Sequence, residues 1–575
     1  MGLLALVAVD YFQLKVPELY QMIINGMNLG YVEMDGVPVP FDVNFLLDHI
    51  CLPLIITILF LVIGRFLWRI CFFGSAIRVE TDVRNRMFDH CKDLSREYYQ
   101  VNKVGNLMSL FTNDLETVQE GFGSGILMVF DAAVMGAMAI FKMIRMDPTL
   151  TLLSLIPMVL LFVVGTIVGK AEMKTWAKRQ EAFSDLSDFS QESFSGIAVI
   201  KAFVKETKEL LAFLRLNRKN EEVNVAFTRI STLLHIFVTL FVESVVCVIL
   251  GYGGYLVYKG EFNAGQLVEF IGYFTAIVWP IMAVSQLIEM SSRGKASVQR
   301  ISELLDAKQD VIDRPGVREL TDPRGRIEFR NLSFAYPDGD QPVLKNDSVV
   351  IEAGESVGIV GKTGSGKTTV VDLMLRMYNV APGMLFVDGE DVNDLSIRSV
   401  RAAMAYVPQD NFLFSDTIEN NIGFSGRNIT PERIEAAARY SDVHKDITEF
   451  RDGYKTVLGE RGVTVSGGQK QRISIARALL KDAAVLILDD SVSAVDTKTE
   501  KSILENLHAT RAGKTTVLIA HRISTIEKMD KIIFVEDGTV AAVGRHEELY
   551  ASNAEYRRMV DLQKLEDEGE VSSHA

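Results

Sequence analysis

The sequence is poor in cysteine and in basic charge, and each shortage argues against a class of protein. Its 575 residues include four cysteines without any C-x-x-C spacing, so we expect neither a zinc site nor a disulfide framework. These cysteines are expected to be small apolar fillers: Cys51, Cys71, Cys91 and Cys247. The net charge of −14 argues against a nucleic-acid partner, because phosphate binding needs a basic face. No secretory signal with a cleavage site is visible.

The first half of the chain holds instead a series of long apolar runs. A helix needs about 20 apolar residues to cross the hydrocarbon core of a bilayer. The segment 149–168, TLTLLSLIPMVLLFVVGTIV, supplies them without any charge. A buried soluble helix could explain one such run but explains a whole series poorly. We therefore predict six membrane spans, over residues 3–24, 50–73, 126–144, 149–168, 231–258 and 266–288.

The charges between the spans predict their orientation, since lysine and arginine stay on the cytoplasmic side. The stretch 30–48 has acids and no base and is expected outside, whereas 72–124 and 170–230 are rich in Lys and Arg and are expected inside, with both termini. Helical spacing of apolar residues predicts that these two cytoplasmic excursions are helices. Each must turn at its tip, near 100–109 and near 195–206. Such a tip could press on another domain or be an ordinary capped hairpin.

Some ionisable residues fall within the predicted spans, where they cost energy and usually face a cavity or a partner. Structural pairing between helices explains Lys15 at least as well as function does. Asp131 and Glu243 have no basic residue nearby in the sequence. We hypothesise that these two acids line a substrate cavity and favour cationic or zwitterionic molecules, with a structural role as the alternative. The other residues of this kind are Asp10, Glu18 and His235.

The second half follows a polar linker at 306–325 and alternates short apolar strands with helices. Its stretch ESVGIVGKTGSGKTTVVDLML places G-x-x-x-x-G-K-T between a strand and a helix, the setting that a phosphate-binding loop requires. The glycines let backbone N–H groups approach the phosphates, and the helix N-terminus adds a favourable dipole. Lys367 should reach the terminal phosphates, and Thr368 should ligate magnesium. The expected nucleotide-binding residues are Gly361, Thr363, Gly364, Ser365, Gly366, Lys367, Thr368 and Thr369.

Two further motifs follow along the chain. The apolar run VLILD predicts a buried strand that ends at Asp489, which we assign to the magnesium shell. The residues Ser466, Gly467, Gly468 and Gln469 begin an arginine-rich helix. Free N–H groups at this helix start offer a second anion site. One phosphate group needs only one such cradle, so we infer that the second motif serves a nucleotide held by another subunit.

These motifs occur in the order found in ABC transporters, and the chain resembles a half-unit of the exporter type over essentially its whole length. The resemblance implies an α-helical six-span transmembrane domain (1–305) and a linker (306–325). An α/β P-loop, RecA-like nucleotide-binding domain with a helical subdomain (326–560) and a polar C-terminal tail (561–575) would follow. The two cytoplasmic tips then resemble coupling helices. The chain starts almost inside the first span, so the elbow helix of the family is expected to be missing or trimmed.

The resemblance also implies roles for single residues. Tyr336 would stack on adenine, Gln409 would contact magnesium and the membrane domain, and His521 would be the switch histidine. The stretch 466–469 matches the signature, although Val465 stands where leucine is usual. The stretch SAVD at 493–496 matches the loop that crosses to the partner, and GERG at 459–462 matches the cross-talk loop.

Asp490 departs from the family pattern, in which a glutamate after the magnesium aspartate activates the attacking water. Aspartate has the same charge but is one methylene shorter, and a general base must come within about 2.6–3.2 Å of its proton. A misplacement on the order of 1 Å can cost on the order of 10²-fold in rate. Because His521 is present, we expect this site to bind ATP well and to cleave it slowly.

The chain thus resembles the degenerate-site subunit of a heterodimeric bacterial multidrug exporter, multi-pass in the inner (plasma) membrane with its nucleotide-binding domain cytoplasmic. The resemblance implies ATP and Mg²⁺ as cofactors, export of drug-like or lipid-like amphipathic molecules, and a partner half-transporter that carries the catalytic glutamate. The alternatives are a homodimer with two slow sites, a lipid or peptide exporter, an importer on the same scaffold, and an ATP-gated channel or receptor. The six predicted spans argue against a soluble ABC-type ATPase.

Overall fold

The computed structural model describes residues 1–34, 37–339, 341–426, 429–459, 462, 464–493 and 495–573, with their side chains except those at 162, 285 and 566–573. The described chain forms two compact units. The first comprises Met1–Asp89 and Leu107–Asp306, and the second comprises His90–Asn106 and Ala307–Ala575. The limits expected from the sequence stay predictions, but these units differ from them in grouping 90–106 with the second half of the chain.

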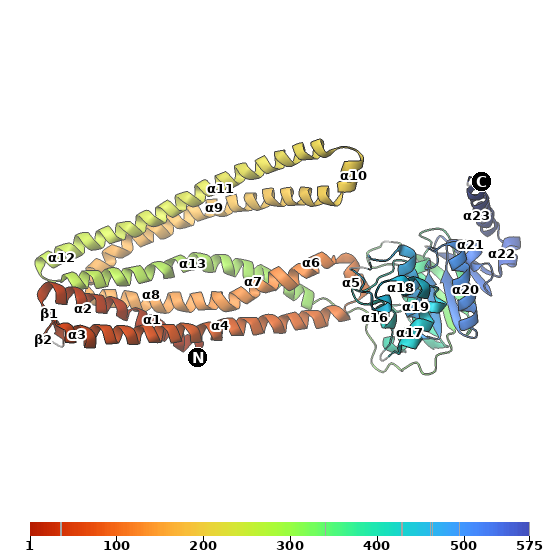
Figure 1. The fold of residues 1–575 in the computed structure, drawn as a ribbon, viewed down its shortest axis with the longest axis horizontal. Coiled ribbons are helices and arrows are strands. Elements are labelled where there is room, and N and C mark those ends of the chain that lie inside the picture. Colours follow the sequence, from red (N-terminus) through yellow and green to blue (C-terminus); the bar gives the residue numbers. More distant parts are fainter. Residues whose placement is uncertain are drawn as a thin grey trace. The chain divides into compact units, whose positions relative to one another are not determined.

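Long helices dominate the first unit (Figure 1). They are α1 (Gly2–Gln13), α2 (Lys15–Leu29), α3 (Val43–Phe45), α4 (Leu52–Asp93), α6 (Val104–Ser109), α7 (Leu115–Glu120), α8 (Ile126–Met146), α9 (Pro148–Ser195), α10 (Ile197–Ala202), α11 (Glu206–Val248), α12 (Gly254–Lys259) and α13 (Ala264–Leu305). π-helical turns at 46–51, 110–114, 121–125 and 249–253 join several of them into longer continuous helices. A short hairpin pairs β1 (Tyr31–Met34) with β2 (Val37–Pro40) in antiparallel register.

Capping residues in the sequence explain where several of these helices begin and end. Asp147 accepts from the Leu150 N–H at 2.6 Å and precedes Pro148, a residue suited to the first helical turn of α9. Asn263 and Gln266 form a capping box at the start of α13. Gly30, in the left-handed conformation with a φ of 77°, ends α2.

Five helical segments of the described chain are long and apolar enough to cross a membrane. They are Val43–Asp93, Val104–Met146, Pro148–Ser195, Glu206–Lys259 and Ala264–Leu305. Each contains or overlaps one of the predicted spans, so five of the predictions are supported by length and composition. Several helices also continue well beyond the predicted spans. Figure 1 shows α9 and α11 as a long hairpin with α10 at its turn.

The first predicted span, 3–24, is not confirmed, because the structure divides it between α1 and α2 at Leu14. Pro17 lies in the first turn of α2. A proline ring clashes with the carbonyl group four residues earlier and removes a helical hydrogen bond. For Pro17 this carbonyl group belongs to Gln13, the last residue of α1. Hydropathy alone does not show this break. The structure thus supports a helical transmembrane domain, but not the predicted number of six spans.

The second unit contains two sheets. A six-stranded sheet has the order β12-β11-β5-β10-β9-β8, and a four-stranded sheet has the order β4-β3-β6-β7. The strands are β3 (Ile327–Phe334), β4 (Leu344–Ile351), β5 (Ser356–Val360), β6 (Leu385–Val387), β7 (Glu390–Asp391), β8 (Met404–Val407), β9 (Val485–Asp489), β10 (Thr515–Ile519), β11 (Lys531–Glu536) and β12 (Thr539–Gly544). Strands β8, β9, β10, β5 and β11 are parallel, and β12 is antiparallel to β11. The apolar sequences of the five parallel strands suit burial on both faces of the sheet.

Helices surround these sheets and form a separate helical part. They are α5 (Arg96–Val101), α14 (Lys367–Met374), α15 (Ile397–Ala402), α16 (Ile418–Gly423), α17 (Pro431–Tyr440), α18 (His444–Glu449), α19 (Gly467–Lys481), α20 (Thr497–Thr510), α21 (Ile523–Ile526), α22 (His546–Ser552) and α23 (Ala554–Ser573). The stretch 561–573, which we expected to be a polar tail, continues α23. Helices α16 to α19 enclose an apolar core of their own, with Ile422 and Ile473 fully buried.

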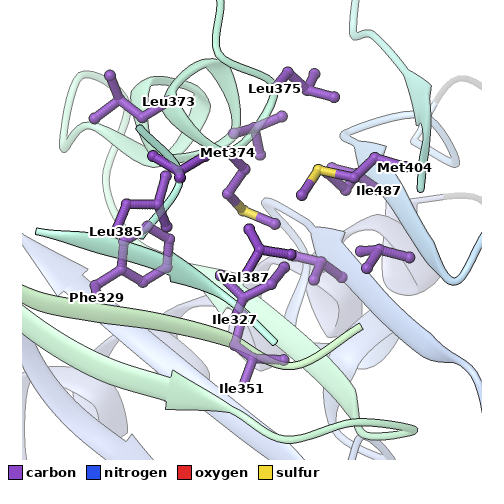
Figure 2. Packing of buried hydrophobic residues seen from close by; sticks show 14 of the residues in the cluster. Ile327, Phe329, Ile351, Leu373, Met374, Leu375, Leu385, Val387, Met404 and Ile487 are labelled. Atoms are coloured by element: carbon purple, nitrogen blue, oxygen red, sulfur yellow. The ribbon is translucent and has the colours of Figure 1, made fainter. Parts of the chain in front are cut away.

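The main core of the second unit lies where the four-stranded sheet meets α14. Figure 2 shows Phe329 and Ile327 of β3 and Leu385 of β6 packed beside Met374 of α14. All four side chains are at most 2% exposed. This packing fixes α14, and with it the loop that precedes the helix, against the end of β5.

Segment 90–106 packs onto this same unit through polar contacts. Arg96 of α5 forms an ion pair with Asp372 of α14. The Tyr378 hydroxyl donates to Gln100 Oε1 at 2.8 Å. Helix α5, which leads into the predicted tip at 100–109, therefore contacts the helix that follows the phosphate-binding loop.

Candidate functional site

The candidate site lies at the carboxyl ends of four parallel strands. The phosphate-binding loop follows β5, Gln409 follows β8, Asp489 ends β9, and His521 follows β10. Open α/β sheets bind ligands at this edge, beyond the carboxyl ends of their strands. The sheet order explains why residues far apart in the sequence come together here.

The phosphate-binding loop requires glycine at two positions. Gly366 has a φ of 97°, in the left-handed region that favours glycine. A Cβ added to Gly361 would lie 2.1 Å from the Val535 carbonyl oxygen. The loop therefore passes against β11 with no room for a side chain. It delivers the chain to the N-terminus of α14, where backbone N–H groups are free for an anion.

Lys367 is a buried cation, and no ion pair of the described residues joins it to a carboxylate. Its ammonium group donates to the carbonyl oxygens of Gly361 at 2.8 Å and Lys362 at 2.9 Å. Burial lowers the pKa of Lys367, although the charges of Asp489 and Asp490 act in the opposite direction. A phosphate bound to the loop would supply the missing counter-charge and raise this pKa.

Asp489 has the complementary property. Its side chain is 1% exposed, and its Oδ2 atom has no hydrogen-bond partner in the described structure. Burial raises the pKa of Asp489, while hydrogen bonds from Thr368 and Tyr406 lower it. A carboxylate oxygen without a partner beside a threonine hydroxyl fits the oxygen ligands that Mg²⁺ prefers. The residues present thus suit a magnesium ion held by Thr368 and Asp489.

Asp490 contacts both of the other candidate catalytic residues. Gln409 Nε2 donates to Asp490 Oδ2 at 3.4 Å, and His521 Nε2 lies 4.0 Å from the same oxygen. Asp490 has a φ of 46°, a left-handed conformation in which aspartate is enriched among non-glycine residues. Gln471 Nε2 donates to its carbonyl oxygen at 3.2 Å and fixes the backbone here.

Tyr336 lies beside the phosphate-binding loop and is half-buried. Its hydroxyl shares a hydrogen bond with Thr369 Oγ1 at 2.9 Å. Its ring packs edge-on against Phe334 and Tyr378, with ring centroids 5.2 Å apart in both pairs. Burial raises the pKa of this hydroxyl. The loop and the expected adenine-stacking residue are therefore neighbours.

The signature residues lie at the start of α19. The Ser466 side chain accepts from the Gln469 N–H at 3.2 Å, and the Ser466 N–H donates to Gln469 Oε1 at 3.0 Å, forming a capping box. Gln469 Nε2 also donates to Asp446 Oδ1 at 3.1 Å. Among the described residues, the hydrogen bonds of 466–469 therefore run within the motif and to the helical part, and none joins it to the phosphate-binding loop of this chain.

Two expected loops fall partly outside the described residues. Positions 460 and 461 of the cross-talk motif and position 494 of the SAVD motif are not described. In the remainder of SAVD, the Ser493 hydroxyl donates to the Asp490 carbonyl oxygen at 2.9 Å, and Asp496 caps α20.

The sequence did not predict a role for Tyr406 or Gln471. Tyr406 lies shortly before Gln409, and Gln471 lies shortly after the signature. Only the fold shows that Tyr406 contacts Asp489 and that Gln471 contacts Asp490.

The two membrane acids lie in different surroundings. Trp279 Nε1 of α13 donates to Asp131 Oδ2 of α8 at 3.0 Å. Asp10 of α1, which is 1% exposed, lies within hydrogen-bonding reach of Asp131. Glu243 of α11 instead lines an open hollow of about 630 Å³ with His235. Asp131 does not line this hollow, and no hydrogen bond or ion pair of the described residues joins it to Glu243.

Two family models match the sequence. The model for the ABC transporter transmembrane region matches residues 14–281, and the model for ABC transporters matches residues 344–493. Each corresponds to one half of the chain described above.

Curated relatives match nearly the whole chain. A probable multidrug resistance ABC transporter ATP-binding/permease protein, YheI of Bacillus subtilis, is 35% identical over 98% of this chain and 95% of its own length. The multidrug resistance-like ATP-binding protein MdlA of Escherichia coli is 34% identical over 98% and 93%. An ATP-dependent lipid A-core flippase of Syntrophus aciditrophicus is 34% identical over 90% and 86%.

A solved structure is similar to the fold. The structure of a bacterial Atm1-family ABC exporter with ATP bound has a TM-score of 0.78 and covers 98% of this chain and 97% of that chain. Its sequence identity of 24% limits the comparison to the fold.

The close passage of the phosphate-binding loop generates a first prediction. Gly361→Ala should weaken ATP binding roughly tenfold or more, because overpacking a close contact costs about 1–3 kcal/mol. The binding of a fluorescent ATP analogue to the purified chain measures this. Gly423→Ala is the control, since its Cβ would meet its nearest neighbour at 3.8 Å. Equal affinities of the two variants would contradict the steric explanation.

Proposed function

Because this chain belongs to the ABC transporter family, as an exporter-type protein that couples ATP hydrolysis to transport, we propose that it is one half of a heterodimeric exporter. In this proposal the chain carries the slow ATP site of the pair. Its signature residues complete the competent site, whose phosphate-binding loop and glutamate belong to the partner chain.

The observation that supports this proposal best is the position of Asp490. Its carboxylate lies near Gln409 and His521, where the family places a glutamate. The side chain is one methylene shorter, so the carboxylate stays closer to the end of β9 and farther from a water in front of the phosphates. A general base that is about one bond length too far from its proton loses much of its rate.

The signature supports the second part of the proposal. Ser466 caps α19 in a well-formed capping box, and the N–H groups of Gly467 and Gly468 begin a helix of 15 residues. Such a helix start attracts an anion. Among the described residues, no hydrogen bond joins the phosphate-binding loop of this chain to the signature, so a triphosphate on a second chain is the natural ligand.

The residues of the chain then act as follows. Lys367 and the N–H groups of the loop and of α14 bind the phosphates, and Gly361 and Gly366 allow their approach. Magnesium, when bound, would neutralise phosphate charge between Thr368 and Asp489. Gln409 and His521 hold the water and the terminal phosphate near Asp490. Closure of two nucleotide-binding domains on ATP shifts the transporter because ATP binds the closed state more tightly.

The substrate is proposed to be an amphipathic small molecule, drug-like or lipid-like. The names of the relatives, which include multidrug resistance proteins and a lipid A-core flippase, support this class. Asp131 adds a preference for cations, because it lies beside a second buried acid and an aromatic ring.

One observation favours a second candidate, a homodimer with two slow sites. Asp490 has a positive φ, and aspartate tolerates this conformation better than glutamate does. The aspartate would then suit the backbone conformation at this position and would not indicate that two chains have unequal ATP sites.

Restoring the glutamate tests the slow site that both candidates place in this chain. The purified chain alone should cleave ATP slowly, and Asp490→Glu should raise the single-turnover rate by up to about 10²-fold, because it returns the carboxylate to its working distance. Asp490→Asn, which has the length of aspartate without the charge, should stay slow. Brisk hydrolysis by the unaltered chain, with no gain from Asp490→Glu, would contradict a slow site.

The proposed cation preference has its own test. Asp131→Asn combined with Glu243→Gln should lower the transport of a cationic dye into inverted vesicles roughly tenfold, because one charge contact in a low-dielectric site is worth a few kcal/mol. Transport of a neutral dye should change little. Glu261→Gln is the control, since this acid is exposed and lies outside the spans' apolar parts. Unchanged export of the cationic dye would contradict a role of these two acids in substrate binding.

A further inference from the structure

The loop that carries His521 is held by a side chain from the far end of the sequence. Gln563, on α23, donates from Nε2 to the His521 carbonyl oxygen at 2.6 Å. Its Oε1 atom accepts from the Ile523 N–H at 2.8 Å. One amide group therefore bonds the backbone on both sides of Arg522, as a neighbouring strand would.

These two backbone groups have no regular partner of their own. Strand β10 ends at Ile519 and α21 begins at Ile523, so residues 520–522 belong neither to the sheet nor to the helix. The Ile523 N–H is one of the free donors at the start of α21. A buried backbone group without a partner is costly, and Gln563 satisfies one donor and one acceptor at once.

Helix α23 is anchored firmly enough to fix this loop. Tyr556 is fully buried, packs edge-on against Phe534 of β11 with ring centroids 5.7 Å apart, and shares a hydrogen bond with His546 Nδ1 at 2.9 Å. Val560 is 1% exposed in the same core as Ile523. Tyr556, Val560 and Gln563 follow the i, i+4, i+7 spacing of one helix face. The face that packs on the sheet thus also presents the amide to the loop.

We propose that Gln563 is a positioning residue for His521, and that α23 sets the direction of the histidine ring toward the phosphate side of the site. The ring lies 4.0 Å from the Asp490 carboxylate through Nε2, and its main chain is held by the Gln563 amide. A small rotation of the loop would move the ring by a distance that matters for catalysis. The inference rests on the role proposed for His521 but not on the pairing of two different chains.

A double-mutant cycle in the full-length chain tests this proposal. Gln563→Met removes both hydrogen bonds with little change in size. It should lower the single-turnover cleavage of Mg-ATP roughly three- to tenfold, the rate equivalent of one or two net hydrogen bonds, without changing ATP affinity. In a His521→Ala background, Gln563→Met should have no further effect, because the residue acts through the histidine.

Matched variants keep the test decisive. Leu562→Ala changes an exposed neighbour on α23 and should leave the rate unchanged. Gln563→Glu keeps the acceptor for Ile523 and loses the donor to His521, so it should lower the rate even if the methionine variant is unstable. The proposal would be overturned if Gln563→Met lowered the rate equally in chains with His521 and with His521→Ala. It would also be overturned if Gln563→Met did not lower the rate when His521 is present. No loss from His521→Ala itself would instead contradict the role proposed for the histidine.

Discussion

The structure of the second unit depends on two buried groups of opposite charge, and the described residues supply no ion pair to either. Lys367 is surrounded by carbonyl oxygens of its own loop, and one oxygen of Asp489 has no partner. Both arrangements are costly in an unliganded protein. A triphosphate bound by Lys367 and a magnesium ion held by Asp489 would supply the missing partners. The apolar packing around Met374 and the buried strand β9 hold the two groups in place against this cost.

Much of this site could be predicted from the sequence, because each motif follows an apolar strand. Parallel strands bring their carboxyl ends to one edge, so the loop after β5, Asp489, Asp490 and His521 meet without further information. Contacts between distant segments were not predictable. Gln563 reaches a loop 42 positions earlier in the sequence, and Arg96 of α5 pairs with Asp372. Neither residue belongs to a motif with a readable spacing.

In the membrane-spanning half, long apolar runs could be predicted from the sequence, whereas the effects of single residues could not. Long apolar runs predicted five of its helical segments. The first run is divided because Pro17 acts on the backbone at one position, and a hydropathy average does not register a single residue. The positions of Asp10 and Trp279 beside Asp131 depend on how three helices pack, so the sequence could suggest Asp131 but not its neighbours.

In the heterodimer that we propose, Asp490 makes the two chains contribute unequally to ATP hydrolysis. Comparing Asp490→Ala with Ser466→Ala in the complex purified with its partner chain measures this inequality most directly. A slow site in this chain predicts that Asp490→Ala barely lowers the steady-state turnover of ATP, whereas Ser466→Ala nearly abolishes it. The opposite ranking would contradict the assignment of the slow site to this chain.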